Sequence, residues 1–368
     1  MCKKTHYKYL LLIVLAIVAS CKTQSNDDVE FKKSIVKRSS LQLEKIGKLL
    51  IESGNGNNIL ARPSNKIQIS PNGSRVGFYD YIHHHFILTN KNGELRKTFG
   101  KQGRGPKELS QVLGWDFDEY NNIVAYDEGQ RLFKIINLDN SQFKNNSIEY
   151  GNNAVFVNSK DTKIQDSLIY KGIIQAEYSS NPQNSNMIGV FNYDGNLKKS
   201  FALYDPYITV SNNYTIQPYF DIDFEQGKVF TTHDNSYRIQ IFDLNTKERL
   251  GYFGFRSPSY RESQSDIKPT YSRAKIKKLT LNQSFADGIY ITSKYILYFF
   301  QNLTEEWNET RDPKSKNYYL SIYERNSNAY IFELKLPGYL ASVYEEKLFI
   351  IENFNPNKFE IGVYKLTD

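Results

Sequence analysis

The stretch Val190-Phe191-Asn192-Tyr193-Asp194-Gly195-Asn196 contains the pattern that decides the fold. A β-branched aliphatic residue and a bulky apolar residue are followed by a polar turn. β-branched and aromatic residues favour strands, while Asp, Asn and Gly favour tight turns. The stretch therefore predicts the end of one strand and a tight connection to the next.

The same pattern of an apolar pair before a polar turn occurs six times along the chain. The pairs are Ile87-Leu88, Ile135-Ile136, Val190-Phe191, Ile241-Phe242, Ile322-Tyr323 and Val363-Tyr364. Successive pairs lie 48, 55, 51, 81 and 41 residues apart, and all but one interval are close to the length of one four-stranded blade. The repeats therefore predict an all-β fold, a six-bladed β-propeller of four-stranded antiparallel blades.

The ends of the chain indicate how the ring closes. The sixth repeat has no outer strand of its own, because the chain stops at Asp368. The segment Leu41–Leu50, ahead of the first blade, can supply this strand. We therefore expect an N-terminal strand added to the last blade, which leaves no exposed strand edge at the seam. In the second blade we expect the outer strand at Ile148–Tyr150.

The N-terminus has the features of a bacterial lipoprotein signal. Three lysines precede an apolar run, Tyr9–Ala19, that is short for a membrane-spanning helix. The run ends in Val18-Ala19-Ser20-Cys21, which resembles the lipobox in which the cysteine takes a diacylglycerol group. We expect residues 1–20 to be a signal peptide, residues 21–40 a flexible tether, and residues 41–368 the propeller. Cys21 is the predicted lipidation site and the predicted contact with the membrane.

Composition excludes some classes of function. After removal of the signal, Cys21 is the only cysteine, so neither an internal disulfide nor a thiolate metal site is expected. The full chain has a net charge of +7, and loss of the three signal lysines leaves a mild excess spread over a large surface. Nucleic acid is therefore not an expected partner. We expect a monomer anchored to the outer membrane of a Gram-negative bacterium, on either its surface-exposed or its periplasmic side.

Two segments carry a resemblance to a known family. Gly100–Pro106 followed by Glu108-Leu109 is similar to the glycine-rich junction of six-bladed, NHL/TolB-like propeller lipoproteins. Ala125–Phe133, in which Asp127 ends one strand and Arg131 precedes the next, resembles the NHL hairpin. The resemblance implies the fold and the lipid anchor but no particular activity. The glycines of this junction either allow the chain to pass tightly from one blade to the next or form a loop that binds a phosphate group.

Loop lengths predict which face of the propeller carries a binding site. In a blade, the turns between strands one and two and between strands three and four lie on one face. The connections between strands two and three, and the crossings to the next blade, lie on the other. The longest segments all fall on this second, loop-rich face, where insertions commonly carry function: 172–186, 204–218, 254–284 and 301–317.

Charged hairpin residues fall on the same face and are candidates for ligand binding. They are Arg104, Asp127, Arg131, His233, Asp234 and Arg238. The alternative is that Asp127 with Arg131, and Asp234 with Arg238, are structural ion pairs across hairpins. In His83-His84-His85, the first and third side chains are expected to point to one side and the second to the other. That run suits a solvated hairpin or, with a third ligand, a metal site.

Two functions remain open at this stage. The first is a membrane-anchored binding or interaction propeller that uses its loop-rich face for a protein or glycan partner, aided by aromatic residues such as Tyr204, Tyr219, Tyr260 and Trp307. The alternative is a propeller enzyme, a lyase or hydrolase, with a cation bound at the central pore. No other cofactor is expected. Polar and acidic residues converging on the pore from several blades would favour the enzyme.

Overall fold

The structure is a computed structural model that describes residues 31–33, 35, 40–52, 60–149, 154–156, 161–175, 184–205, 217–262, 271–355 and 357–368. The predicted signal peptide and Cys21 lie outside these residues, as do parts of the long segments 172–186, 204–218 and 254–284. Within the described part of the chain, no helix has both the length and the apolar character needed to cross a membrane.

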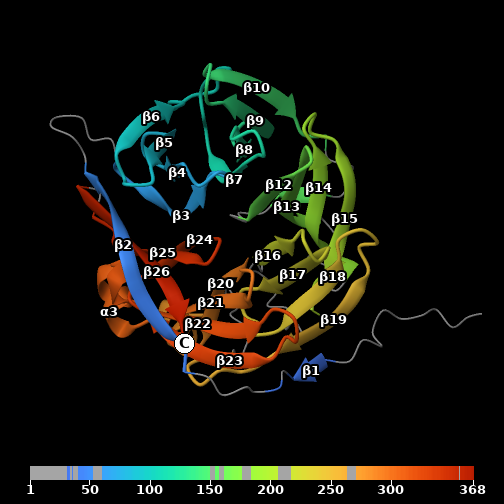
Figure 1. Cartoon of the computed structure of the whole chain (residues 1–368), viewed down its shortest axis with the longest axis vertical. Helices are drawn as coiled ribbons and strands as arrows, with labels where there is room; N and C mark the ends of the chain where they lie inside the picture. The colour runs from blue at the N-terminus through green and yellow to red at the C-terminus, as the bar shows by residue number, and fades with distance from the viewer. Residues whose placement is uncertain are drawn as a thin grey trace, which may run out of the picture.

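Six sheets surround a central axis, as predicted (Figure 1). From the axis outward, blade 1 consists of β3 (Pro63–Ile69), β4 (Arg75–Asp80), β5 (His85–Asn90) and β6 (Leu95–Phe99), and blade 2 of β7 (Val112–Phe117), β8 (Ile123–Asp127), β9 (Leu132–Asn137) and β10 (Gln142–Ser147). Blade 3 consists of β12 (Thr162–Gln165), β13 (Leu168–Gln175), β14 (Asn186–Asn192) and β15 (Leu197–Leu203), and blade 4 of β16 (Pro218–Asp223), β17 (Lys228–His233), β18 (Ile239–Asp243) and β19 (Arg249–Gly254). Blade 5 consists of β20 (Ser284–Ile291), β21 (Tyr295–Asn302), β22 (Asn317–Glu324) and β23 (Tyr330–Leu336), and blade 6 of β24 (Tyr339–Tyr344), β25 (Lys347–Asn353), β26 (Lys358–Thr367) and β2 (Gln42–Glu52).

The N-terminal closure of the ring is confirmed. Strand β2 pairs antiparallel with β26, from Gln42 opposite Thr367 to Glu52 opposite Lys358. The edge of the last blade is therefore covered by a strand from the other end of the chain. A short strand that the sequence did not indicate, β1 (Phe31–Lys33), pairs in parallel with β19 on the outside of blade 4.

The outer strand of blade 2 corrects the expectation for Ile148–Tyr150. The strand is the polar segment β10, which follows its turn directly and pairs with β9. Five of its six residues are polar, because an outermost strand has solvent on its edge and needs no continuous apolar face. In blade 3 a further short strand, β11 (Ala154–Phe156), pairs with the far end of β13 beyond β12.

Aromatic side chains link each blade to the next. A close ring pair lies at every junction around the circle, with centroids 5.0 to 6.2 Å apart: Phe86–Trp115, Phe133–Phe191, Phe201–Phe242, Phe253–Tyr323, Phe299–Tyr339 and Phe78–Phe359. Such pairs add to the apolar area that each junction buries. The blades are thus joined by packing, with no need for a disulfide.

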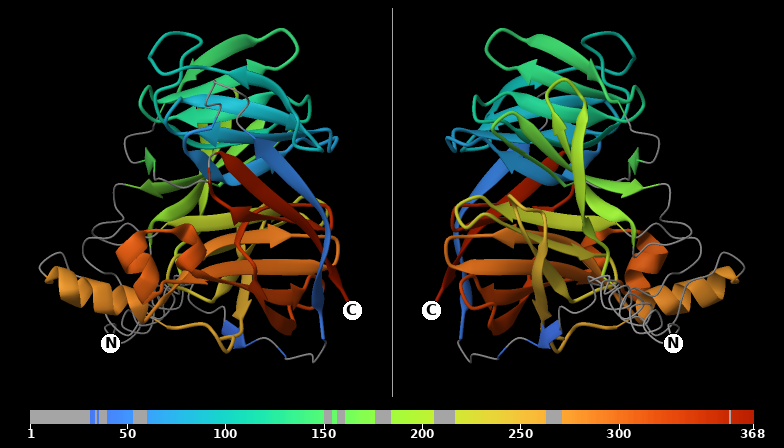
Figure 2. Two further views of the ribbon diagram at one scale, coloured as in Figure 1. Left: turned by 90° about the vertical axis from the view of Figure 1, so that its left-hand side faces the viewer. Right: turned by 90° about the vertical axis from the view of Figure 1, so that its right-hand side faces the viewer.

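The loop-rich face carries the helices that the structure describes. Helix α2 (Arg273–Leu281) lies in the crossing from blade 4 to blade 5. Helix α3 (Glu305–Thr310) and the 3₁₀ turn η4 (Pro313–Ser315) lie between β21 and β22. Figure 2 shows α2 and α3 projecting from the same side of the ring. The opposite, short-turn face has only tight connections.

Candidate functional site

A cavity of about 700 Å³ surrounds the propeller axis and opens on the short-turn face; we call it the central funnel. All six inner strands contribute to its lining, through Gln68, Asp116, Lys163, Asp221, Ile291 and Ser342. Its rim is formed by the turns after those strands, including Pro71, Ser293 and Glu345. The sequence favoured the other face, because the long loops, the charged hairpins and several aromatic residues were all assigned to it.

The lining of the funnel is strongly charged. It has two cationic side chains, Lys163 and Arg325, and six carboxylates, Asp116, Asp221, Asp223, Glu225, Glu345 and Glu346. The chain as a whole has the opposite balance, with a net charge of +7. A concave surface with low-dielectric walls concentrates the field of its charges. The funnel therefore favours cations although the protein around it is basic.

The floor of the funnel is built by three successive blades. Lys163 of blade 3 lies with its Nζ 2.8 Å from Oδ1 of Asp221 in blade 4. The second oxygen of Asp221 accepts a hydrogen bond of 3.0 Å from the backbone N–H of Ile291 in blade 5. Burial disfavours the charged form of Lys163 and lowers its pKa. The attraction of the nearby carboxylates Asp221 and Asp116 is the larger effect in sum, so the pKa of the ammonium group is raised. The pair is thus a fixed, charged part of the floor.

Asp116 of blade 2 differs from the other floor carboxylate. Burial raises its pKa to about 6, although Lys163 and the N–H of Phe117 favour the ionised form. Its Oδ1 accepts the hydrogen bond from Phe117 at 2.8 Å. A carboxyl group with a pKa near neutral exchanges protons readily at physiological pH. Asp116 is therefore the residue of the floor best suited to respond to a ligand or to donate a proton.

A second ion pair holds one side of the rim. The Arg325 guanidinium of blade 5 contacts both oxygens of Asp223 in blade 4, each at 2.6 Å, and Glu225 at 2.8 Å. On the neighbouring side, Glu346 accepts a 2.7 Å hydrogen bond from the N–H of Ser293. These bonds run between blades, so the rim is held in one shape before any ligand binds.

The candidate residues from the sequence lie on the loop-rich side, and the first hairpin is structural. Asp127 is buried and accepts hydrogen bonds from the backbone N–H groups of Ser110 and Gln111, at 2.9 and 3.0 Å. Its cationic neighbour is Lys134, at 4.0 Å, whereas the side chain of Arg131 is exposed. Asp127 therefore fixes the chain that enters the inner strand of its own blade, and the expected pairing with Arg131 is wrong.

The second hairpin follows the same principle. Asp234 accepts a hydrogen bond of 3.2 Å from the N–H of Gln217, just before the inner strand of blade 4. Arg238 lies 4.0 Å from Asp205. His233 is buried, and this burial lowers its pKa to about 4, so the imidazole is neutral at physiological pH. The three side chains support the base of the crossing between blades 3 and 4.

The glycine-rich junction passes tightly between blades 1 and 2. The N–H of Gly105 donates to Glu108 at 2.8 Å. Gly103 has a φ of +151°, and a Cβ there would lie 2.0 Å from the Glu108 carboxylate. Arg104 between them is exposed. The loop thus wraps around one of its own carboxylates, which supports the tight-passage interpretation over an anion cradle.

The histidine run has the alternation expected from the sequence. The rings of His83 and His85 stack with centroids 5.2 Å apart, while Nδ1 of His84 is 3.1 Å from the hydroxyl of Tyr79. Across the described part of the chain, no group of three or more His, Cys, Asp or Glu side chains is placed to hold a metal ion. Acidic residues do converge on the pore, an arrangement that suits a bound cationic ligand as well as the enzyme alternative.

The loop-rich face is less aromatic at its surface than the sequence suggested. Tyr204, Tyr219 and Tyr260 are buried in the core. Trp307 on α3 is half-buried and lies between two cations, 4.3 Å from Arg311 and 4.9 Å from Lys316, measured to the ring centroid. Of these aromatic residues, only Trp307 keeps a role on that face.

Sequence reasoning missed the floor residues, although a signal for them exists. Asp116 follows Gly114-Trp115 and precedes Phe117, and Asp221 stands between Phe220 and Ile222. A carboxylate within an otherwise apolar inner strand marks a side chain that points to the axis. One inner strand alone does not identify such a residue. The carboxylate stands out only when the inner strands of the six blades are aligned with one another.

No protein-family model matches the chain, and no curated protein matches it in sequence. Solved structures do resemble its fold. A member of the DUF4221 family from Bacteroides vulgatus has a TM-score of 0.64 at 16% identity, over 90% of this chain and 100% of that one. A putative exported protein from Bacteroides fragilis has a TM-score of 0.60 at 11% identity, over 92% and 100%. The PQQ-bound aldose sugar dehydrogenase of Streptomyces coelicolor has a TM-score of 0.51 at 11% identity, over 89% and 99%. At these identities the similarity establishes the propeller fold only.

Proposed function

We propose that this protein is a lipid-anchored binding propeller that takes a small cationic ligand in the central funnel. The observation that carries the proposal is the lining itself, in which six carboxylates and two cations from around the ring face one cavity. The local field is negative in a chain of net charge +7. A substituted ammonium group suits such a site, because it is attracted to carboxylates and to the faces of aromatic rings.

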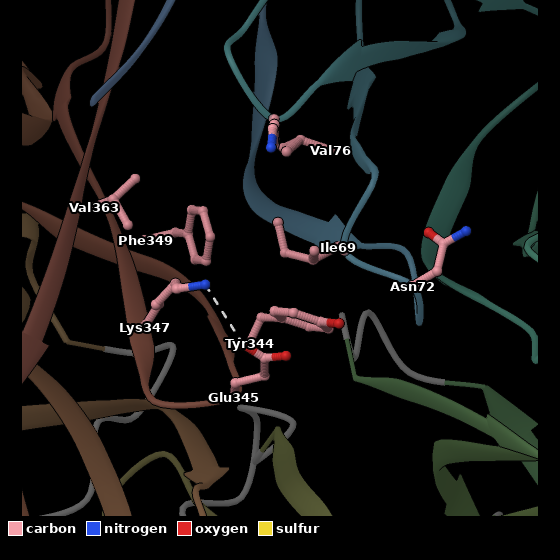
Figure 3. Close-up of a pocket in the computed structure, with 10 residues that line it drawn as sticks. Ile69, Asn72, Val76, Tyr344, Glu345, Lys347, Phe349 and Val363 are labelled. Carbon is pink, nitrogen blue, oxygen red and sulfur yellow. Dashed lines mark hydrogen bonds and ion pairs between the residues drawn. The ribbon is translucent and has the colours of Figure 1, made fainter. Parts of the chain in front are cut away.

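The funnel offers both kinds of contact. Asp116 and Glu346 are among the carboxylates of the lining, and Phe117, Phe224 and Tyr344 (Figure 3) are its aromatic residues. The volume of about 700 Å³ lies in the range typical of small-molecule sites. A rim fixed by bonds between blades reduces the ordering that a ligand has to impose.

The test uses three probes of equal length and different charge: n-butylammonium, n-butanol and butyrate. Ligand-observed NMR is expected to show the strongest binding for the ammonium and the weakest for butyrate. Asp116→Asn and Glu346→Gln are expected to weaken ammonium binding, while Asp194→Asn, an exposed carboxylate outside the funnel, is the matched control. Butyrate binding as strongly as the ammonium would refute the proposal.

The anchor is the second part of the proposal. The lipobox-like sequence ending at Cys21 supports it, and the similarity of the fold to that of the putative exported protein from Bacteroides fragilis supports an envelope location. Cells expressing the wild-type chain are expected to label it with radioactive palmitate and to retain it in the outer-membrane fraction. Cys21→Ser is expected to lose both properties. Equal labelling of the variant would rule out this lipidation site.

A second candidate function uses the loop-rich face for a protein or glycan partner. The supporting observation is Trp307, presented between Arg311 and Lys316 on an insertion. The insertion is held against blade 5 by a hydrogen bond of 2.8 Å from the hydroxyl of Tyr318, on strand β22, to the carbonyl of Pro313. Replacing residues 304–315 with a short Gly-Ser linker is expected to preserve folding and to reduce capture of cell-envelope proteins or glycans. Unchanged capture would remove this candidate.

A further inference from the structure

Helix α2 concentrates positive charge at an exposed place on the loop-rich face. Four of its nine residues are basic and none is acidic. None of its residues is buried, and the side chains of Arg273, Lys275 and Lys278 are exposed. We call these three side chains the basic surface. Because the helix projects from the ring, the basic surface is accessible to a large partner.

The charges of α2 do not serve the stability of the helix. Arg273 and Lys275 stand in its first turn, where the helix dipole disfavours cations. Arg273 and Lys277, four positions apart, and Lys275 and Lys278, three positions apart, are pairs of like charge that repel each other. The N-cap is favourable, since Ser272 accepts a hydrogen bond of 3.3 Å from the N–H of Lys275. Such a local conflict within an otherwise well-formed helix is typical of a functional surface.

The helix is nevertheless held in a defined position. Lys277 pairs with Glu305 of α3 at 2.8 Å. The guanidinium of Arg261 donates a hydrogen bond of 2.6 Å to the carbonyl oxygen of Leu281 at the end of α2. Among the described residues, by contrast, no carboxylate forms an ion pair with a member of the basic surface. The charge of Lys277 is thus used within the protein, whereas the other three are available to a partner.

The place of α2 in the ring indicates which anionic partner it meets. Strand β1 runs along the outer edge of blade 4, and α2 lies in the crossing from blade 4 to blade 5. Figure 2 shows both in the lower part of the ring. Nine residues lie between Cys21 and Phe31, so the proposed anchor holds this part of the ring near the lipid. Clusters of Lys and Arg beside a membrane bind anionic headgroups.

We infer that the basic surface of α2 docks on an anionic lipid membrane, as a second contact beside the acyl anchor. The choice of lipid as the partner rests on the proposed anchor. Tyr271 suits the same surface, because tyrosine is enriched at membrane interfaces, and its ring centroid lies 3.5 Å from Nζ of Lys275. The acyl chains attach the protein, whereas the basic surface fixes which part of the ring faces the lipid. The central funnel opens on the opposite face and stays accessible.

The experiment measures vesicle binding by the chain from residue 22 onward, which lacks Cys21 but keeps every described residue. Flotation with vesicles of phosphatidylcholine alone is compared with flotation with an equal mixture of phosphatidylcholine and phosphatidylglycerol. Binding is expected only to the mixture, and added salt is expected to weaken it. Combined Arg273→Gln, Lys275→Gln and Lys278→Gln is expected to lower the partition coefficient about a hundredfold, since each basic side chain near an anionic surface contributes roughly fivefold. Glutamine is a good helix former, so this variant is expected to fold.

The matched control removes the same charge from the other side of the ring. It combines Arg96→Gln, Lys97→Gln and Lys144→Gln, three exposed residues on the outer strands of blades 1 and 2, and is expected to retain the affinity. An equal loss in both triple variants overturns the inference, because total charge then determines binding. Equal flotation with the two kinds of vesicle also overturns it, and that comparison needs no variant to fold. Neither result bears on Cys21, which the tested chain lacks, so palmitate labelling decides the anchor separately.

Discussion

Asp116 permits a direct test of the electrostatics of the funnel floor through protein stability. Burial moves its pKa from 3.8 to about 6, so the folded protein holds this proton more tightly than the unfolded chain. The contribution of Asp116 to the free energy of unfolding therefore falls as the pH rises from about 4 to about 6, and it is constant above that range. With about 1.4 kcal/mol for each pKa unit, ionised Asp116 costs about 3 kcal/mol of folding free energy at neutral pH.

The Asp116→Asn variant removes this cost but keeps the acceptor that binds the N–H of Phe117. Urea denaturation is expected to give a stability gain of about 3 kcal/mol near pH 7.5 and of only about 1 kcal/mol near pH 4.5, where the wild-type group is still protonated. Asp139→Asn is the control, because that carboxylate is 85% exposed and its removal is expected to change little at either pH. A gain that is the same at both pH values, or a loss at pH 7.5, would refute the reasoning.

Further substitutions test the rim, a tight turn and the closure of the ring. Arg325→Met leaves the buried Asp223 unpaired and is expected to lower the free energy of unfolding by about 3–5 kcal/mol, most of it recovered by adding Asp223→Leu. Gly195→Ala places a Cβ 2.1 Å from a backbone oxygen at a φ of +90° and is expected to cost more than about 2 kcal/mol, whereas Gly47→Ala, whose nearest neighbour is 3.8 Å away, is expected to cost less than about 1 kcal/mol. A chain that begins at residue 60 lacks β2, exposes the edge of β26, and is expected to elute as aggregates in size-exclusion chromatography.

The fold was predictable because each blade repeats one local signal. Pairs such as Ile135-Ile136 lie in third strands, which are packed on both faces and need apolar residues there. The closing strand was predictable by elimination, since the sixth repeat lacked an outer member. The polar outer strand β10 was not, because an edge strand is held by its backbone hydrogen bonds to β9 and carries little apolar pattern.

The site was much less predictable than the fold. Asp116, Lys163 and Asp221 are separated by 47 and 58 residues, and they meet only because the ring places successive inner strands around one axis. Asp127 and Asp234 were candidates because both stand in similar charged hairpins, in which an Asp precedes an Arg by four residues. That likeness has a structural cause, since both carboxylates accept hydrogen bonds from the chain that enters their blade. Similarity between repeats therefore identified a feature of the fold, whereas the site uses positions that differ between blades.

The N-terminal strands also affect where the funnel works. The first described strand, β1, runs along β19 at the outer edge of blade 4, so the proposed tether leaves from the rim of the ring and from neither face. Only nine residues lie between Cys21 and Phe31, and the ten steps from one Cα to the other span at most about 35 Å when fully extended. On the proposed anchor, the propeller therefore stays close to the lipid surface with its rim toward it, and the central funnel faces along the membrane. Anionic lipid headgroups raise the concentration of small cations within about one Debye length of the membrane surface. A short rim tether thus keeps the funnel where the proposed cationic ligand is most concentrated.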